Sequence, residues 1–297
     1  MEIAGRLAEA LGSTLIGSRT LAGGFSHETA LLTLADGPVV ARVGGGDPAI
    51  EAAVMDRARA VVPVPQVLLV EEQCMVIEYV AGDPLSEVLD AGRGDLAALG
   101  EVVGHTIARI GSIRLDRPGF FTGPELTVKP EEPWSQQLPG MARWCMDRVP
   151  DGRLSDRVRA DWIELCAEEA PLLAAVDSIA RLTHADVNPK NILVARDAGG
   201  WRVTAVLDWE FAYSGCPYGD AANMVRFGGD YPAGFVAGFE AGFAGDQPAD
   251  LPLRADWARI GRVLDMFALS DLVTRTPGHV VADQAAAVIV SRTRAMR

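Results

Sequence analysis

Two short apolar segments joined by a tight turn constrain the fold of this chain most strongly. Ile192–Ala195 and Val203–Leu207 are rich in β-branched side chains, and the turn at 197–200 reads Asp-Ala-Gly-Gly. Apolar β-forming runs on either side of such a turn predict a β-hairpin. The hairpin brings the residues just before its first strand close to those just after its second.

Polar residues stand at this open end of the predicted hairpin. His184, Asp186 and Asn191 precede the first strand, and Asp208 follows the second. A carboxylate and an amide oxygen that face each other suit a hard divalent cation such as Mg²⁺. A further carboxylate nearby can orient a hydroxyl group and accept its proton. The pattern therefore predicts a phosphoryl-transfer site, and turn capping by the same Asp and Asn residues is the simpler alternative.

The segment H-A-D-V-N-P-K-N, followed by L-D-W-E, resembles the catalytic loop and metal-binding aspartate of the aminoglycoside phosphotransferase family, which is related to the protein kinases. The resemblance implies that Asp186 is the catalytic base and that Asn191 and Asp208 bind Mg²⁺. It also implies that His184 supports the loop. Asp220 matches the aspartate that buttresses this loop by bonding its backbone, although an Asp at a helix N-terminus is also favoured by the helix dipole.

A departure from the protein kinases concerns the residue two positions after the base. Protein kinases place a phosphate-binding lysine there, whereas this chain has the neutral Asn188. We expect Mg²⁺, Arg42 and Lys190 to offset the phosphoryl charge instead. Asp208 and Asp220 are also only 12 positions apart, which leaves no room for the activation segment on which peptide substrates dock. The spacing favours a small-molecule acceptor.

The N-terminal part has the pattern of a helix at 2–11 followed by strands at 14–21, 30–34 and 39–43. The loop A-G-G-F-S-H-E-T joins the first two strands, and its small residues would let backbone N–H groups approach phosphate oxygens. The family resemblance assigns Ser26 to this phosphate contact. A plain hairpin turn is the alternative, since Gly23-Gly24 is a weak signal.

Arg42 lies within the apolar strand V-V-A-R-V, where an inward-pointing charge needs a partner. Asp47-Pro48 has the pattern of an N-cap followed by a first-turn proline, and it predicts a helix from Ala49 to about Ala60. Glu51 in its first turn is placed to pair with Arg42. The resemblance implies that this ion pair holds nucleotide phosphates; an edge-strand Arg and a helix-dipole Glu are the alternative.

Two more strands follow Pro63 and Pro65, and Glu78-Tyr79-Val80 leaves the sheet toward Gly82. The resemblance implies a hinge in which backbone groups of Glu78 and Val80 contact the purine. Because backbone recognition does not depend on the side chains, ATP and GTP both remain open as phosphate donors.

The remainder of the chain is predicted to be helical apart from the hairpin. Relatives of this type form the acceptor pocket from helices inserted here, so Phe120, Trp134 and Trp144 are candidate substrate contacts; core packing is the alternative for each. The helices are expected at 84–91, 95–113, 134–148, 155–176, 217–227, 232–243, 253–274 and 280–296.

Composition excludes some classes of protein. The net charge of −13 argues against nucleic-acid binding, which needs an excess of Lys and Arg. The four Cys residues are dispersed without a C-x-x-C pair, which argues against a zinc site or a disulfide framework. No apolar run reaches the length of a membrane span, and the N-terminal sequence does not have the pattern of a signal peptide. We expect a cytoplasmic protein.

The sequence therefore predicts an α+β, protein-kinase-like fold with two lobes. Residues 1–80 would form a nucleotide-binding lobe with a five-stranded antiparallel sheet, 81–84 a hinge, and 85–297 a mainly helical lobe. The larger lobe would contain the catalytic loop and hairpin (182–210) and an acceptor-binding subdomain. The predicted activity is Mg²⁺-dependent transfer of phosphate from ATP or GTP to a small-molecule hydroxyl, most simply on an antibiotic. A metabolic kinase for choline, homoserine or a sugar is the nearest alternative, followed by a nucleotide-binding pseudoenzyme and a metallohydrolase.

Overall fold

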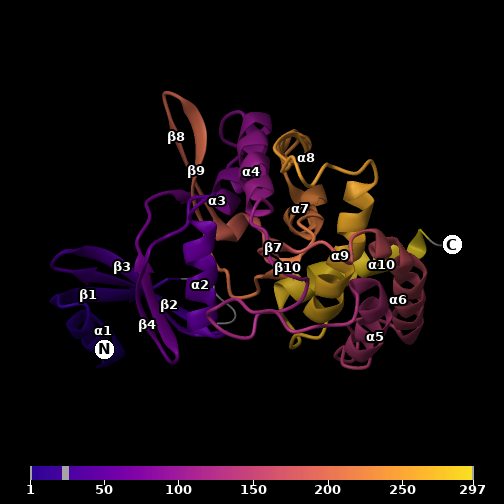
Figure 1. The fold of residues 1–297 in the computed structure, drawn as a ribbon, viewed down its shortest axis with the longest axis horizontal. Coiled ribbons are helices and arrows are strands. Elements are labelled where there is room, and N and C mark those ends of the chain that lie inside the picture. The colour runs from indigo at the N-terminus through magenta and orange to yellow at the C-terminus, as the bar shows by residue number, and fades with distance from the viewer. Residues whose placement is uncertain (1, 22–26, 296–297) are drawn as a thin grey trace.

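The computed structural model describes residues 2–21 and 27–295. Two lobes lie side by side, with the N-terminal sheet at one end of the molecule and the C-terminal helices at the other (Figure 1). Helix α1 (Glu2–Ala10) leads into an antiparallel five-stranded sheet of order β1-β2-β3-β5-β4. Its strands are β1 (Leu15–Thr20), β2 (His27–Leu34), β3 (Gly37–Gly44), β4 (Val67–Glu71) and β5 (Cys74–Glu78). The predicted fold is confirmed, and Ser26 of the predicted phosphate loop lies outside the described residues.

The sheet of the N-terminal lobe buries both faces. Alternation along β3 sends Val39 and Ala41 into a small core with Leu7 of α1, while Arg42 points to the opposite face. Helix α2 (Pro48–Ala58) covers that opposite face. Asp47 caps α2 by accepting from the N–H of Ala49 at 2.9 Å, with Pro48 in the first turn. The structure confirms the helix that the Asp47-Pro48 pattern predicts.

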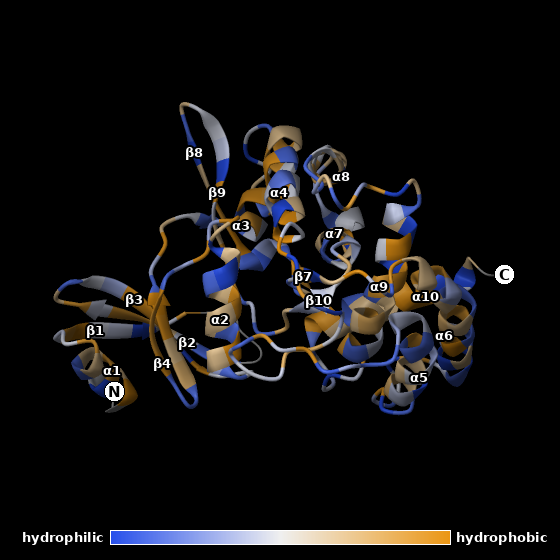
Figure 2. Ribbon diagram, viewed as in Figure 1, coloured by the Kyte–Doolittle hydropathy of each residue, from blue (hydrophilic) through white to orange (hydrophobic). Residues whose placement is uncertain are grey.

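The C-terminal lobe is mainly helical. In Figure 2 its helices each carry hydrophobic and hydrophilic residues, as expected for amphipathic helices that bury one face. Its helices and short strands are β6 (Asp83–Pro84), α3 (Leu85–Asp90), α4 (Leu96–Ile110), α5 (Trp134–Met146), α6 (Asp156–Glu169), β7 (Arg181–Thr183), β8 (Ile192–Asp197), β9 (Gly200–Val206), β10 (Tyr213–Gly215), α7 (Tyr218–Val225), α8 (Phe235–Gly245), α9 (Trp257–Leu272) and α10 (Val280–Arg294), with 3₁₀ turns at Ala170–Ala175, Pro189–Asn191 and Gly228–Asp230.

The helix predicted at 155–176 is shorter than expected. The α-helix ends at Glu169, and a 3₁₀ helix covers Ala170–Ala175. Pro171 has no N–H to donate to the preceding turn, which explains why the α-helical hydrogen bonding stops here.

Strands β8 and β9 form the predicted hairpin, with Ile192 opposite Val206. On its other side β8 pairs with β6, so that Asp83 lies opposite Val194. Two residues of the segment expected to be a hinge thus already pair with the C-terminal lobe. This pairing joins the segment after β5 to the strand that follows the loop at 184–191.

Helices α4 and α8 approach closely enough for their backbones to touch. A Cβ atom on Gly104 would lie 2.1 Å from the carbonyl oxygen of Phe239, and one on Gly242 would lie 2.1 Å from that of Glu101. Only glycine permits this separation. The contact fixes α8 and the turn before it against the rest of the lobe.

Within the described part of the chain, no helix combines the length and the apolar character that crossing a membrane requires.

Candidate active site

The loop that follows β7 is held by a buried carboxylate. Asp220, in the first turn of α7, accepts hydrogen bonds from the backbone N–H groups of His184 at 2.9 Å and Ala185 at 2.8 Å. Ala185 has a φ of 67°, a conformation that non-glycine residues rarely adopt. Burial raises the pKa of Asp220 to about 7, and the two N–H donors act against this rise. Asp220 thus stabilises a strained turn that presents the next residue, Asp186.

His184 supports the same loop from inside the protein. The N–H of Asp186 donates to its Nδ1 at 3.2 Å, which leaves the proton on Nε2 to donate to the carbonyl of Leu207 at 2.9 Å. Burial lowers the pKa of His184 to about 4, so the ring is neutral at neutral pH. Its ring also packs against Trp209, with centroids 4.5 Å apart. A fully buried neutral imidazole in this role is a support and not a base.

Asp186 is oriented by neighbouring amides. The side-chain amide of Asn191 donates to Oδ2 of Asp186 at 2.9 Å and to its carbonyl at 3.0 Å, and Asn188 donates to the same carbonyl at 3.1 Å. These bonds turn the side-chain nitrogen of Asn191 toward Asp186. The side-chain oxygen of Asn191 is therefore available to bind a cation. Burial, and then Asp208, raise the pKa of Asp186 to about 6, against the effects of Arg226, Asn188 and Asn191.

Arg42 of the N-terminal sheet pairs with Asp208 of the C-terminal lobe. Its guanidinium forms ion pairs with Glu51 of α2 and, at 2.6 Å, with Asp208. Oε1 of Glu51 also accepts from the backbone N–H of Trp209 at 3.0 Å. Asp208 itself has a φ of 66°. The predicted pairing of Arg42 with Glu51 is present, and both side chains are buried.

Glu210 is a further acidic residue near Asp208. One ligand atom from each of His27, Asp208 and Glu210 falls within 4.8 Å of the others. Oε2 of Glu210 accepts from the N–H of Gly46 at 3.0 Å, whereas its buried Oε1 has no hydrogen-bond partner among the described residues. Nδ1 of His27 lies 3.9 Å from this oxygen, and a buried carboxylate oxygen without a hydrogen bond favours the approach of a cation. The donor set of carboxylates with the Asn191 amide oxygen fits a divalent cation.

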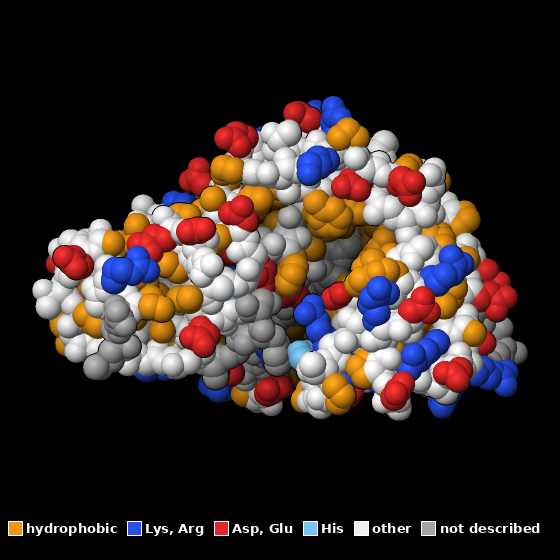
Figure 3. Space-filling view, turned by 90° about the horizontal axis from the view of Figure 1, so that it is seen from below, with side chains coloured by type: hydrophobic (Ala, Val, Ile, Leu, Met, Phe, Trp, Pro, Cys, Tyr) orange, Lys and Arg blue, Asp and Glu red, His pale blue; other side chains and the backbone are white. Residues whose placement is uncertain are grey.

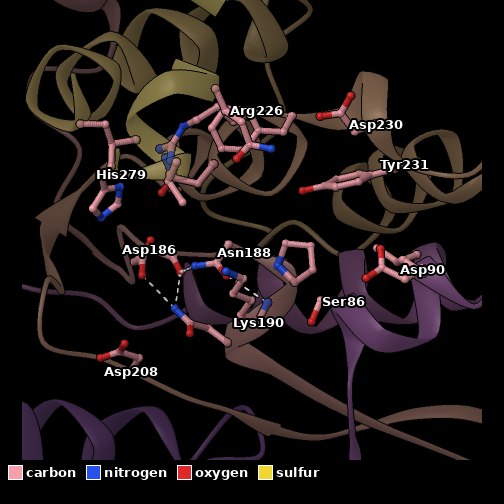
Figure 4. Close-up of a pocket in the computed structure, with 18 of the residues that line it drawn as sticks. Ser86, Asp90, Asp186, Asn188, Lys190, Asp208, Arg226, Asp230, Tyr231 and His279 are labelled. Atoms are coloured by element: carbon pink, nitrogen blue, oxygen red, sulfur yellow. Dashed lines mark hydrogen bonds between the residues drawn. The ribbon is translucent and has the colours of Figure 1, made fainter. Parts of the chain in front are cut away.

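Two cavities meet at Asp186. The first, of about 670 Å³, is lined by Asp186, Asn191, Asp208 and Lys190 on one side. Figure 4 shows Asp208 on one side of Asp186, with Arg226 and His279 on the other. The second, of about 660 Å³, is lined by Asp186 together with Phe120, Trp134 and Trp144. Figure 3 shows a hollow in the surface of the molecule, with hydrophobic side chains on its rim.

The hinge candidates lie apart from these cavities. Glu78 ends β5, and its N–H already donates to the carbonyl of Gln66 at 2.8 Å. Glu78 and Val80 line a separate hollow of about 470 Å³, beside residues 59–64 and Thr204. Their contact with a purine stays a prediction.

Arg226 lines both cavities with Asp186, and sequence reasoning missed it. Its side chain is 7% exposed and pairs with the fully buried Asp265 of α9, from Nε at 2.8 Å and from Nη2 at 2.6 Å. Asn223 donates to the same Asp265 oxygen at 2.9 Å. An arginine at the end of an amphipathic helix gives no sequence signal that it points inward. Glu210 is different, because its position two residues after Asp208 is a sequence signal that it lies near the same site.

Known proteins resemble this chain in sequence and in fold. Residues 18–259 match the family described as the phosphotransferase enzyme family. A thermostable mutant of the aminoglycoside phosphotransferase APH(4)-Ia, solved with ADP and hygromycin B, is 19% identical with a TM-score of 0.71 over 99% of this chain and 98% of that one.

Two further solved structures share the fold. A putative fructosamine-3-kinase from Thermobifida fusca is 19% identical, with a TM-score of 0.67 over 97% of this chain and 98% of that one. The macrolide 2′-phosphotransferase MphH from Brachybacterium faecium is 20% identical, with a TM-score of 0.60 over 96% and 98%. No curated protein sequence matches the chain.

Proposed function

The chain belongs to the phosphotransferase enzyme family and is therefore a phosphotransferase; we propose that it moves the terminal phosphoryl group of ATP or GTP to a hydroxyl group of a small molecule. The observation that carries this proposal is the position of Asp186. Its half-buried carboxylate is oriented by Asn191 at the junction of two cavities, one reaching Asp208 and the other walled by aromatic side chains.

The proposed reaction is an in-line displacement. The acceptor hydroxyl lies against Asp186, which aligns the oxygen and accepts its proton as the new O–P bond forms. The bond between the terminal phosphorus and its bridging oxygen breaks, and the nucleoside diphosphate leaves. With a pKa of about 6, Asp186 is mostly ionised at neutral pH yet basic enough to take the proton late in the step.

Asn191, Asp208 and Glu210 are the residues that would hold Mg²⁺. When bound, Mg²⁺ supplies positive charge that neutralises the phosphate oxygens as the bond breaks. On the nucleotide side we assign Arg42 to the phosphates, with Glu51 holding it in place, and Lys190 as a further cation at the cavity wall. The ADP bound to the related APH(4)-Ia mutant supports a nucleotide as the donor.

We also propose that the N-terminal lobe ends at residue 80 and that the C-terminal lobe begins at residue 85. As the acceptor, we favour an antibiotic. The hygromycin B and macrolide enzymes among the related structures support an antibiotic, while the fructosamine-3-kinase neighbour supports a metabolic sugar derivative.

Nucleotide consumption, measured for ATP and GTP with Mg²⁺ over a panel of antibiotics, choline, homoserine and fructosamines, tests the proposal. We expect acceptor-dependent consumption matched by a phosphorylated product. Nucleotide turnover that no hydroxyl compound stimulates would contradict it.

A further inference from the structure

The second cavity beside Asp186 differs in character from the first. It lies between α5 and α9, and most of its lining side chains are aromatic or aliphatic. We propose that this cavity binds the body of the acceptor, and that the acceptor is an alcohol with a largely apolar body and not a polycationic sugar. This inference rests on the proposed phosphotransferase function, since it takes Asp186 as the group that receives the hydroxyl.

One face of α5 forms a wall of this cavity. Trp134, Gln137, Met141 and Trp144 recur at helical spacing and all line it. Trp134 is fixed by edge-on contacts with Tyr213 at 5.3 Å and Phe267 at 6.0 Å between centroids. Trp134 is therefore held in place before any ligand arrives, which lowers the entropic cost of binding against it.

Three aromatic side chains at this cavity remain largely exposed. Phe120 is 51% exposed, Trp144 49% and Phe211 45%. Large apolar side chains gathered around a concave surface are typical of a ligand-binding site. At about 660 Å³ the cavity has the size that accommodates drug-sized ligands. An acceptor with apolar rings would cover these side chains and release the water that they order.

Several charged groups of the cavity already have an ion-pair partner, in the cavity or behind it. Asp271 accepts from Arg275 at 2.9 Å, and Arg226 is paired with Asp265. Besides Asp186, the remaining carboxylate in the lining belongs to Glu132. An acceptor with several ammonium groups would have to share the Asp271 carboxylate with Arg275, so the cavity offers few carboxylates to a polycation.

Gly140 offers a way to fill the cavity without disturbing the fold. It lines the cavity on α5, and a Cβ atom built on it would have no atom within 4 Å. Gly140→Leu should therefore place an apolar side chain in the space that the acceptor needs, while the helix gains a better helix former. Gly5 of α1 has an equally open position far from the site, so Gly5→Leu is the matched control.

The test measures binding and transfer separately. Calorimetry in the presence of AMP-PNP and Mg²⁺ compares two alcohols with largely apolar bodies (the apolar alcohols), erythromycin and naphthaleneethanol, with hygromycin B. We expect the apolar alcohols to bind the unaltered protein more tightly than hygromycin B does. Gly140→Leu and Trp144→Ala should each weaken erythromycin binding by about tenfold or more, and Gly5→Leu should not change it.

Tighter binding of hygromycin B, failure of both apolar alcohols to bind, or equal erythromycin affinity in Gly140→Leu and Gly5→Leu would overturn the inferred acceptor class. Phosphate transfer from ATP or GTP is then assayed with the same compounds. Binding with the expected pattern but without transfer would contradict the proposed function and leave the apolar site in place. Transfer to hygromycin B that Gly140→Leu leaves unchanged would contradict the acceptor class alone.

Discussion

Arg42 and Asp208 are 166 positions apart in the chain, yet an Nη atom of the arginine lies 2.6 Å from a carboxylate oxygen of the aspartate. The same guanidinium pairs with Glu51, and Glu51 in turn accepts from the backbone of Trp209. One buried cation therefore connects β3, α2 and the loop after β9. Arg42 pairs with the carboxylates of Glu51 and Asp208, and Glu210 lies near Asp208, which leaves negative charge for a bound divalent cation to neutralise.

The first prediction concerns this buried cation. Arg42→Met should lower the free energy of unfolding by about 3 kcal/mol, because it leaves buried carboxylates without their partner. Arg42→Lys should cost less, since an ammonium keeps the charge but cannot fork onto two carboxylates. Urea denaturation at neutral pH measures both. Equal midpoints for the original protein and Arg42→Met would show that the ion pairs contribute nothing.

The second prediction concerns the metal site. Asp208→Ala should remove most of the enhancement that Mg²⁺ gives to nucleotide affinity. The substitution deletes the carboxylate that would bind Mg²⁺ together with Asn191 and Glu210. Calorimetry with ATP or GTP, with and without Mg²⁺, measures this enhancement. Asp197→Ala, at the exposed end of the same hairpin, is the control and should retain it. An undiminished Mg²⁺ effect in Asp208→Ala would remove Asp208 from the site.

A third prediction follows from the raised pKa of Asp186. Burial places this pKa at about 6, and the carboxylate must be ionised to accept a proton. As the pH falls below about 6, kcat/KM for the acceptor should decrease by about tenfold per pH unit, and above it the rate should level off. A pH–rate profile gives the result directly. A profile that stays flat well below pH 6 would mean that another group accepts the proton.

Packing of α4 against α8 gives a fourth prediction. Gly104→Ala should destabilise the protein by about 3 kcal/mol, because its Cβ would collide with the backbone of α8. Gly140→Ala is the matched control, since it adds the same atom to a helix where nothing lies within 4 Å. Thermal unfolding compares the two variants. If both behave alike, the close approach of α4 and α8 does not limit stability.

Much of the fold and of the catalytic loop was predictable because its signals are local. The hairpin followed from two β-rich runs and their turn, and α2 followed from its Asp47-Pro48 start. The spacing of Asp186 and Asn191 lies within one loop, and Asp208 follows from the return of the hairpin. Arg42 and Glu51 could be paired because a buried strand cation needs a nearby carboxylate.

The acceptor side was much less predictable. Arg226 and Asp265 meet only because α7 and α9 pack together, and no short-range pattern indicates which faces of two helices touch. For the aromatic side chains of this lobe, the sequence leaves substrate contact and core packing as alternatives; these are Phe120, Trp134 and Trp144. The structure places all three around one cavity, with Trp134 also buried in the core. Tertiary packing decides such questions.

The most direct test of the central claim is a comparison of Asp186→Ala with the original protein in two assays. Phosphate transfer to the best acceptor should fall to background, because the hydroxyl loses the group that aligns it and takes its proton. Binding of ATP or GTP with Mg²⁺ should remain nearly unchanged, because Asn191, Asp208 and Arg42 are intact. Near-normal transfer by Asp186→Ala would contradict the account.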